Sequence, residues 1–210
     1  MVSVIKRGRP PSPLKRQAIL QAAIRLLSEK GADASTTREI AERADTTERT
    51  LFKHFGSKAG LIQAALDEVS FEFMRVANYA RVHDPEPFKA AEFREWHHEF
   101  LSGRVRAAEA APEAYRILFS ELLRDPEFRG RYADRWLAGV FKPLERHIKR
   151  MQSAGEMVAE LPAAVLTATF FNLNLGYLLT RFALMPNSNW HSAGDVAAVV
   201  ETFARVSRPA

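Results

Sequence analysis

The chain has 210 residues, of which 47% are hydrophobic and 26% are charged, a composition typical of a soluble globular protein of one or two domains. It contains no cysteine, which excludes disulfide bonds and thiolate zinc sites. Residues 1–60 carry 12 Lys/Arg and 6 Asp/Glu, whereas residues 61–210 carry 18 and 19. All the excess positive charge therefore lies in the first 60 residues, as expected for a surface that binds nucleic acid or an anionic membrane.

Residues 1–12 form a basic arm without an apolar stretch long enough for a signal peptide, so we expect a cytoplasmic protein. Within the arm, Arg7-Gly8-Arg9 resembles the core of an AT-hook, in which a flat Arg-Gly-Arg lies along a narrow minor groove. The alternative is a basic tail that only adds nonspecific affinity for phosphates. The sequence leaves both interpretations open.

Apolar residues recur with helical periodicity and no strand alternation, which predicts an all-α fold. Ser12-Pro13 supplies an N-cap and an N1 proline for a helix over residues 13–30, which Gly31 ends. This helix is the first of a predicted domain over residues 13–60.

Two short helices follow. Thr36 and Glu39 fit a capping box, which predicts a helix from residue 37, and Asp45 stands where a left-handed residue would end it. Thr47 caps a third helix over residues 48–54. Two short helices joined by a three-residue turn predict a helix-turn-helix.

The third helix and the start of the fourth are rich in hydrogen-bond donors suited to phosphate oxygens and base edges. Arg49 is the best candidate for reading a base, since guanidinium pairs with guanine in a bidentate manner. Glu48 is favoured by the helix dipole, and a contact with cytosine is the alternative. Lys58 follows the N-cap Ser57, where a cation opposes the helix dipole, so a phosphate clamp explains it better.

The stretch TTREIAERADTTERTLFKHFGSKAGLIQAAL, with the first helix and the basic start, resembles the DNA-binding domain of the TetR family of transcriptional regulators over residues 14–66. The matching positions are Thr37, Ile40-Ala41, Ala44, Thr50-Leu51-Phe52, His54-Phe55 and Ser57-Lys58. The resemblance implies contacts with double-stranded DNA at Thr37, Thr47, Arg49, Thr50, Phe52, Lys53, His54 and Lys58.

Three residues depart from the family pattern. Asp45 replaces the usual glycine, Phe52 the usual tyrosine and Gly60 the usual glutamate, which removes a capping box after Ser57. Phe52 either stacks on a sugar or covers the turn between the helices. For His54 we favour a phosphate donor over a solvated helix end.

Beyond residue 66 the resemblance is one of architecture. Prolines near helix starts predict helices near residues 58–80, 86–108, 113–124, 127–153, 162–184 and 193–207, which with the first three make nine. Residues 61–210 are then an effector-binding and dimerisation domain by resemblance.

Residues 161–180 lack charge over a length that would span a bilayer, but Asn172 and Asn174 interrupt them, so we predict a buried helix instead. One seam of this helix and part of the last helix resemble the family's four-helix homodimer interface. Its predicted residues are Thr169, Asn172, Gly176, Ala183, Val199 and Phe203.

The aromatic-rich middle of the chain corresponds to the region that encloses an effector pocket in the family. We expect Trp96, Phe100, Phe119 and Asn172 near a pocket for a small, largely apolar effector. By the family's default, the protein is a repressor that the effector releases from an inverted-repeat operator.

An enzyme is the less favoured interpretation. Glu95 and His98 form one Glu-x-x-His, half of a di-iron signature, and the sequence has no second copy. No phosphate-binding loop or hydrolase motif is present, so we expect no catalysis, no cofactor and no metal. A non-specific architectural DNA-binding protein is the other alternative, since such a protein would require only the basic residues of the first 60 positions.

Overall fold

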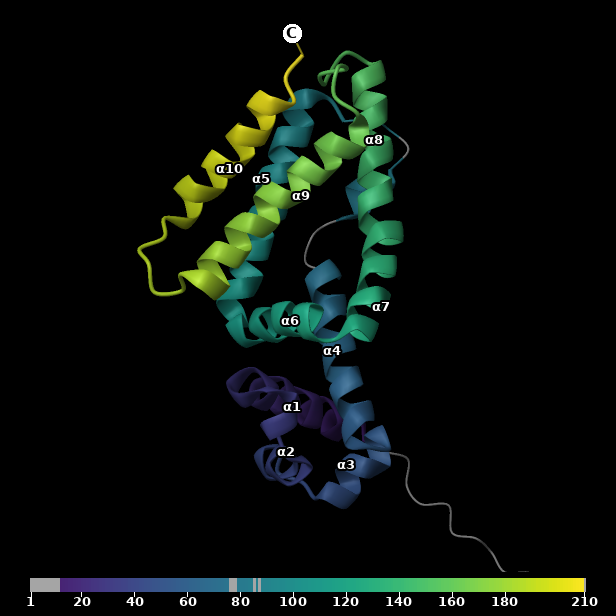
Figure 1. Cartoon of the computed structure of the whole chain (residues 1–210), viewed down its shortest axis with the longest axis vertical. Coiled ribbons are helices and arrows are strands. Elements are labelled where there is room, and N and C mark those ends of the chain that lie inside the picture. Colours follow the sequence, from purple (N-terminus) through teal and green to yellow (C-terminus); the bar gives the residue numbers. More distant parts are fainter. Residues whose placement is uncertain (1–11, 76–78, 85, 87, 210) are drawn as a thin grey trace, which may run out of the picture. The chain divides into compact units, whose positions relative to one another are not determined.

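The computed structural model describes residues 12–75, 79–84, 86 and 88–209, and every regular element within these ranges is helical (Figure 1). The chain forms two compact units, Met1–Val69 and Ser70–Ala210. The prediction of an all-α fold is therefore confirmed, and the first unit extends beyond the boundary after residue 60 that the sequence suggests.

The first unit contains α1 (Pro13–Ala34), α2 (Thr37–Arg43), α3 (Glu48–Phe55) and the first part of α4 (Lys58–Arg75). Gly31, with φ of 78°, interrupts α1 where the sequence predicts its end. The apolar face of α1 is buried together with one or two residues from each following helix. The fully buried side chains are Ile19, Leu20, Ile40, Leu51 and Leu61.

The ends of α2 follow the predicted local signals. The Thr36 hydroxyl accepts a hydrogen bond from the Glu39 N–H, and the Glu39 carboxylate accepts one from the Thr36 N–H at 3.1 Å, which confirms the capping box. Asp45 has φ of 48°, the left-handed conformation expected there. The Thr46 N–H then donates to the Ala41 carbonyl at 2.9 Å and closes the turn.

The second unit contains α5 (Ala90–Ala110), α6 (Pro112–Arg124), α7 (Pro126–Trp136), α8 (Lys142–Ser153), α9 (Ala163–Leu179) and α10 (Ser192–Val206). A 3₁₀ turn (Tyr79–His83) precedes α5, and π turns follow α7 (Leu137–Phe141) and α9 (Thr180–Leu184). Helix α10 packs along α5 and α9, and α8 packs against α9 (Figure 1).

The predicted helix over residues 127–153 corresponds to α7, the π turn and α8 taken as one. With that grouping the described part of the chain has nine α-helices, as predicted. Helix α5 begins at Ala90 rather than near residue 86, because the Lys89 N–H is capped by the carboxylate of Glu92 at 3.1 Å.

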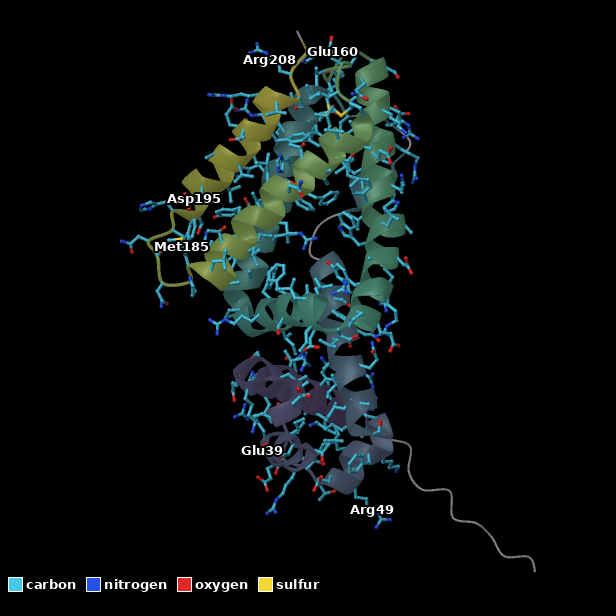
Figure 2. The ribbon with its side chains drawn as sticks, in the orientation of Figure 1. Glu39, Arg49, Glu160, Met185, Asp195 and Arg208 are labelled. Carbon is cyan, nitrogen blue, oxygen red and sulfur yellow. The ribbon has the colours of Figure 1, made fainter. Side chains whose placement is uncertain are left out.

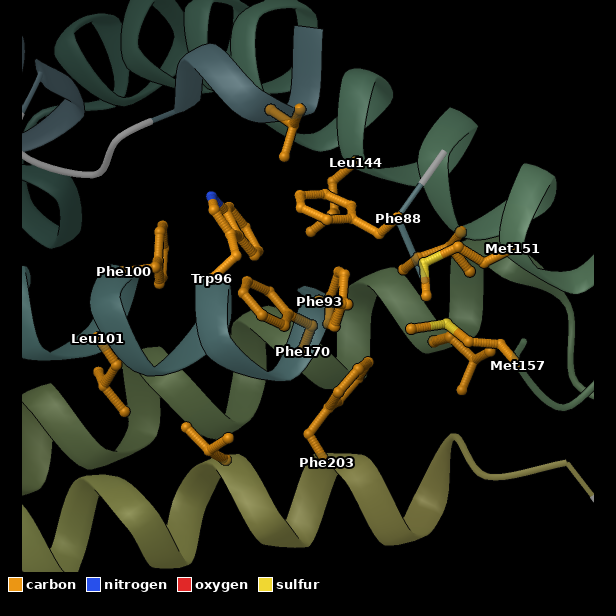
Figure 3. Packing of buried hydrophobic residues seen from close by; sticks show 14 of the residues in the cluster. Phe88, Phe93, Trp96, Phe100, Leu101, Leu144, Met151, Met157, Phe170 and Phe203 are labelled. Carbon is orange, nitrogen blue, oxygen red and sulfur yellow. The ribbon is translucent and has the colours of Figure 1, made fainter. Parts of the chain in front are cut away.

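Aromatic side chains from α5, α9 and α10 make up the centre of the second unit (Figure 3). Phe170 is fully buried, and its ring centroid lies 5.7 Å from Trp96 and 5.4 Å from Phe203. Phe93 and Phe100 contact the same ring. Because large aromatic groups dominate core energetics, this cluster anchors α9 and α10 to α5.

Residues Ala163–Leu184 are long and apolar enough to cross a membrane by length and composition alone. Two buried polar groups nevertheless attach this helix to its neighbours. Asn174 contacts His97 of α5, and Arg181 pairs with Glu109 at 2.6 Å and donates to Ser192 at 2.8 Å. These partners, together with Phe170, identify α9 as a core helix of the unit, in agreement with the prediction.

Candidate DNA-binding surface and ligand pocket

Helix α3 is held at both ends and in the middle by residues of the first unit. The Thr47 hydroxyl accepts a hydrogen bond from the Thr50 N–H at 3.3 Å, and Gly56 ends the helix with φ of 76°. Leu51, fully buried, fixes the inner face against the core. The opposite face is therefore free to contact a partner.

The outer face of α3 presents Arg49, Phe52 and Lys53, which follow the three- and four-residue spacing of one helix face. All three side chains are exposed, and Phe52 is 39% exposed, unusual for a large aromatic group. Figure 2 shows the Arg49 side chain extending away from the ribbon of α3. This combination of a guanidinium, an ammonium and an aromatic face suits the edges and sugars of a DNA groove.

Thr37 has a role that the sequence did not indicate. Its hydroxyl donates to the carboxylate of Glu48 at 2.5 Å, so it ties the start of α2 to the start of α3. A threonine hydroxyl has a single hydrogen, so this bond uses the donor expected for phosphate. Glu48 also lies in the first turn of α3, where the helix dipole stabilises a negative charge.

His54 and Lys58 lie at the ends of α3 and α4. Burial, with the nearby charges of Lys53 and Arg16, lowers the pKa of His54 and so favours the neutral form of its ring. The Lys58 ammonium lies 3.4 Å from the Asp33 carbonyl oxygen, at the outer limit of a hydrogen bond.

The connection between α3 and α4 explains the glycine at position 60. A Cβ at Gly60 would lie 2.3 Å from the Phe55 carbonyl oxygen, a distance that atoms in proteins do not adopt. The Gly60 N–H still donates to the Ser57 hydroxyl at 3.0 Å, so half of the capping box persists. The departure from glutamate therefore permits a closer approach of the two helices.

The Asp45 turn is joined to α1 as well. The Lys15 ammonium donates to the Asp45 carbonyl oxygen at 2.7 Å. Arg7 and Arg9, the candidates for minor-groove contacts, lie outside the described residues.

The second unit contains a pocket of about 430 Å³ between α5, α6, α7 and α9. Its aromatic lining consists of Phe100, Phe119, Tyr132, Trp136 and Phe171, and its leucine lining of Leu122, Leu123, Leu175, Leu178 and Leu179. The remaining lining is Ala133, Arg104, Arg129 and Asn174. The volume lies in the ~300–1,000 Å³ range of small-molecule sites.

Two of the four predicted pocket residues, Phe100 and Phe119, line this cavity. Trp96 does not line it, because its ring stacks on Phe170 inside the core. Asn172 does not line it either, because it is exposed on another face of α9, and Asn174 contributes the amide instead.

Both π turns of the unit begin beside the pocket. Trp136 is the last residue of α7 before the π turn Leu137–Phe141, and Leu179 is the last residue of α9 before Thr180–Leu184. Single π turns inside helices occur often at functional sites, since they redirect side chains locally. The sequence contains no signal for them.

The predicted interface residues fall into two groups. Asn172, Gly176 and Ala183 are exposed, and Thr169 and Val199 are half-buried, so these five can contact a partner. Phe203 is 1% exposed because it packs against Phe93, His97 and Phe170, so it cannot. Val165, four residues before Thr169, adds an exposed apolar side chain to this face of α9.

The Glu95 and His98 side chains are both exposed on α5. Among the described residues no group of three or more His, Asp or Glu side chains is placed to hold a metal ion.

Residues 19–65 match the family described as bacterial regulatory proteins, tetR family. The chain is 50% identical over 52 residues to the helix-turn-helix transcriptional regulator YvkB of Bacillus subtilis, covering 25% of this chain and 28% of that protein. It is 41% identical over 59 residues to the transcriptional repressor Rv3405c of Mycobacterium tuberculosis, covering 28% and 31%. The chain therefore matches less than a third of the length of these relatives.

Solved structures resemble the whole chain. A TetR family transcription regulator from Marinobacter aquaeolei aligns with a TM-score of 0.67 at 17% identity, covering 92% of this chain and 95% of that one. Salmonella enterica GusR aligns with a TM-score of 0.66 at 20% identity, covering 95% and 96%. At this level of identity the alignments establish the fold alone.

The first unit is a capped helix-turn-helix domain, and the second is a separate all-α unit that contains a pocket. Over residues 19–65 the first unit therefore resembles the domain of bacterial regulatory proteins of the tetR family.

Proposed function

We propose that the protein is a cytoplasmic, sequence-specific DNA-binding transcriptional regulator that acts as a homodimer and represses until a small, largely apolar effector releases it. The observation that carries this proposal is the outer face of α3, where Arg49, Phe52 and Lys53 are exposed on a helix capped at both ends. A rigid helix with this side-chain set fits the major groove.

Binding selection from random duplexes tests this function. A regulator should enrich an inverted repeat whose half-site centres are separated by about 34 Å per helical turn or a small multiple of it. Arg49→Ala should cost roughly 1 to 3 kcal/mol and relax one position in each half-site. Enrichment of no sequence would instead favour the non-specific architectural DNA-binding protein.

The homodimer is supported by the exposed seam of α9. Gly176 is exposed and a Cβ there meets no atom within 4 Å, while apolar Val165 is about half exposed on the same face of α9. Small residues on one face allow close approach of a second copy, and a two-fold dimer matches an inverted repeat. Sedimentation of a monomer at micromolar concentration would refute this part.

The effector role is supported by the apolar pocket of the second unit. A ligand changes DNA affinity only if it binds the DNA-bound and free conformations unequally, typically by about 1 to 3 kcal/mol. By linkage, operator DNA must weaken effector binding by the same factor. Calorimetry with and without operator measures that factor, and equal affinities would refute release by the effector while leaving DNA binding intact.

A further inference from the structure

The pocket has only one uncharged amide in its wall, Asn174, and the state of this amide indicates what the pocket binds. Asn174 Nδ2 donates to the Phe170 carbonyl oxygen at 2.7 Å and lies 2.9 Å from His97 Nε2. The Phe170 carbonyl oxygen can only accept, so the atom bonded to it is the amide nitrogen, and the other amide atom is the acceptor Oδ1.

The amide oxygen keeps acceptor capacity as a result. An amide oxygen has two lone pairs, and the contact with the single His97 Nε2 at 3.1 Å uses at most one of them. Burial lowers the pKa of His97 to about 4, which keeps the ring neutral and leaves one ring nitrogen as an acceptor. Oδ1 is therefore available to a donor in a mostly apolar pocket.

The rest of the wall restricts the shape and the charge of a ligand. Five aromatic side chains, from α5, α6, α7 and α9, line the pocket, and aromatic rings pack best against the faces and edges of other rings. The charged lining residues are Arg104 and Arg129, and no carboxylate accompanies them, which disfavours a cation.

Both arginines contact groups of the protein itself. Arg129 Nη1 donates to the Leu122 and Leu123 carbonyl oxygens at 3.1 and 3.3 Å, at the end of α6. The Arg104 guanidinium lies 5.1 Å from the centroid of the Phe100 ring. An anionic ligand would have to pair with one of these guanidinium groups to offset the cost of its burial, whereas a neutral ligand has no such cost to offset.

We propose that the pocket takes an uncharged aromatic compound of the phenol type, whose hydroxyl donates a hydrogen bond to Asn174 Oδ1. This inference rests on the proposed function, because it names the chemical class of the effector. It makes Asn174 the residue that selects hydroxylated ligands from hydrocarbons of the same shape.

Three probes of matched size test the inference by calorimetry on the full chain: 2-naphthol, 2-methylnaphthalene and 2-naphthoate. 2-Naphthol should bind about tenfold more tightly than 2-methylnaphthalene, which lacks the donor. Asn174→Leu should reduce this ratio to about one while 2-methylnaphthalene still binds. Asn187→Leu is the control, because Asn187 is exposed between the π turn Thr180–Leu184 and α10, outside both the lining and the predicted interface, and should keep the ratio.

Several outcomes would overturn the inference. They are equal affinity of the unmodified chain for 2-naphthol and 2-methylnaphthalene, tighter binding of 2-naphthoate, and binding of none of the three. The ratio on the unmodified chain decides the question even if Asn174→Leu does not fold, which circular dichroism reveals. The binding selection from random duplexes is a separate experiment. The proposed ligand class can therefore be refuted while the proposed DNA binding is confirmed, and the proposed DNA binding can be refuted while the ligand class is confirmed.

Discussion

The hydroxyl of Thr37 and the carboxylate of Glu48 are hydrogen-bonded at 2.5 Å and join the first helical residues of α2 and α3. Both residues lie on the part of the unit expected to meet DNA, yet they bond to each other. The pair therefore ties the start of α3 to the start of α2, and we expect Thr37 to affect DNA binding through the position of α3.

A double-mutant cycle separates this positioning role from a phosphate contact. Thr37→Val should weaken operator binding in the unmodified chain but have little further effect once Glu48 is changed to Gln, because the two changes remove one shared bond. We expect a coupling of about 1 kcal/mol in binding titrations. Additive effects of the two substitutions would mean that Thr37 contacts DNA independently.

Lys58 should act as a phosphate clamp. Lys58→Ala should weaken binding to all sequences alike and reduce the slope of log affinity against log salt by about one per protomer. Lys30→Ala is a control of equal charge, because the Lys30 ammonium is already paired with Glu39 at 2.6 Å. Titrations at several salt concentrations measure both, and an unchanged slope for Lys58→Ala would contradict the clamp.

Gly60 tests the close approach of α3 and α4. Gly60→Ala places a methyl group 2.3 Å from the Phe55 carbonyl oxygen, so the backbone must shift, and we expect a loss of roughly 1 to 3 kcal/mol in the free energy of unfolding. Gly130→Ala is the control, because a Cβ there meets nothing within 4 Å in α7, and should be neutral or stabilising by up to about 1 kcal/mol. Denaturant unfolding measures the stability of both variants. If Gly60→Ala were as stable as Gly130→Ala, the backbone would have to move away from the added methyl group without a cost in stability.

Local signals made the first unit predictable from sequence. The capping box at Thr36, the left-handed residue at Asp45 and the cap at Thr47 each depend on residues within a few positions, and each is present. Local signals did not explain why position 60 is a glycine. The explanation is that a Cβ there would lie too close to the Phe55 carbonyl oxygen, which only the folded structure shows.

By contrast, local sequence signals could not show which face of α9 is buried and which is exposed. This helix is apolar nearly all round, so periodicity does not distinguish the side that faces α5 from the side that is exposed. Two residues further along a helix point to a nearly opposite side, which is why Asn174 lines the pocket and Asn172 does not. Phe203 of α10, which resemblance to the family's interface predicts at the seam, packs in the core against Phe93 and Phe170 instead.

The burial of His97 predicts a pH dependence of stability. Burial lowers the pKa of His97 from 6.5 to about 4, against the hydrogen bond with Asn174, which raises it. Between these values the unfolded chain binds a proton that the folded chain does not, so stability falls as the pH falls from about 6.5 to 4. The loss should reach about 3 kcal/mol.

Unfolding of His97→Gln over the same pH range provides the comparison. His147, whose pKa burial also lowers, remains in both chains, so the difference in slope belongs to position 97. Parallel pH profiles for the two chains would show that His97 titrates normally.

The exposed seam of α9 gives the last prediction. Gly176 is exposed and a Cβ there meets nothing within 4 Å, so a large side chain extends outward without disturbing its own protomer. Gly176→Trp should therefore keep the helical content and melting temperature of the protomer while it separates two copies at the seam. Because both half-sites must be bound together, operator affinity should fall along with the dimer fraction.

Gly130→Trp is the matched control, since Gly130 is also an exposed helical glycine with open space around it but lies on α7. Sedimentation measures the dimer fraction of both variants, and binding titrations on the selected inverted repeat measure their affinities. We expect Gly130→Trp to dimerise and bind like the unmodified chain. If Gly176→Trp also remained dimeric with full affinity, the two copies would have to meet elsewhere, because a tryptophan at the centre of a close helix pair cannot be accommodated without separating the helices.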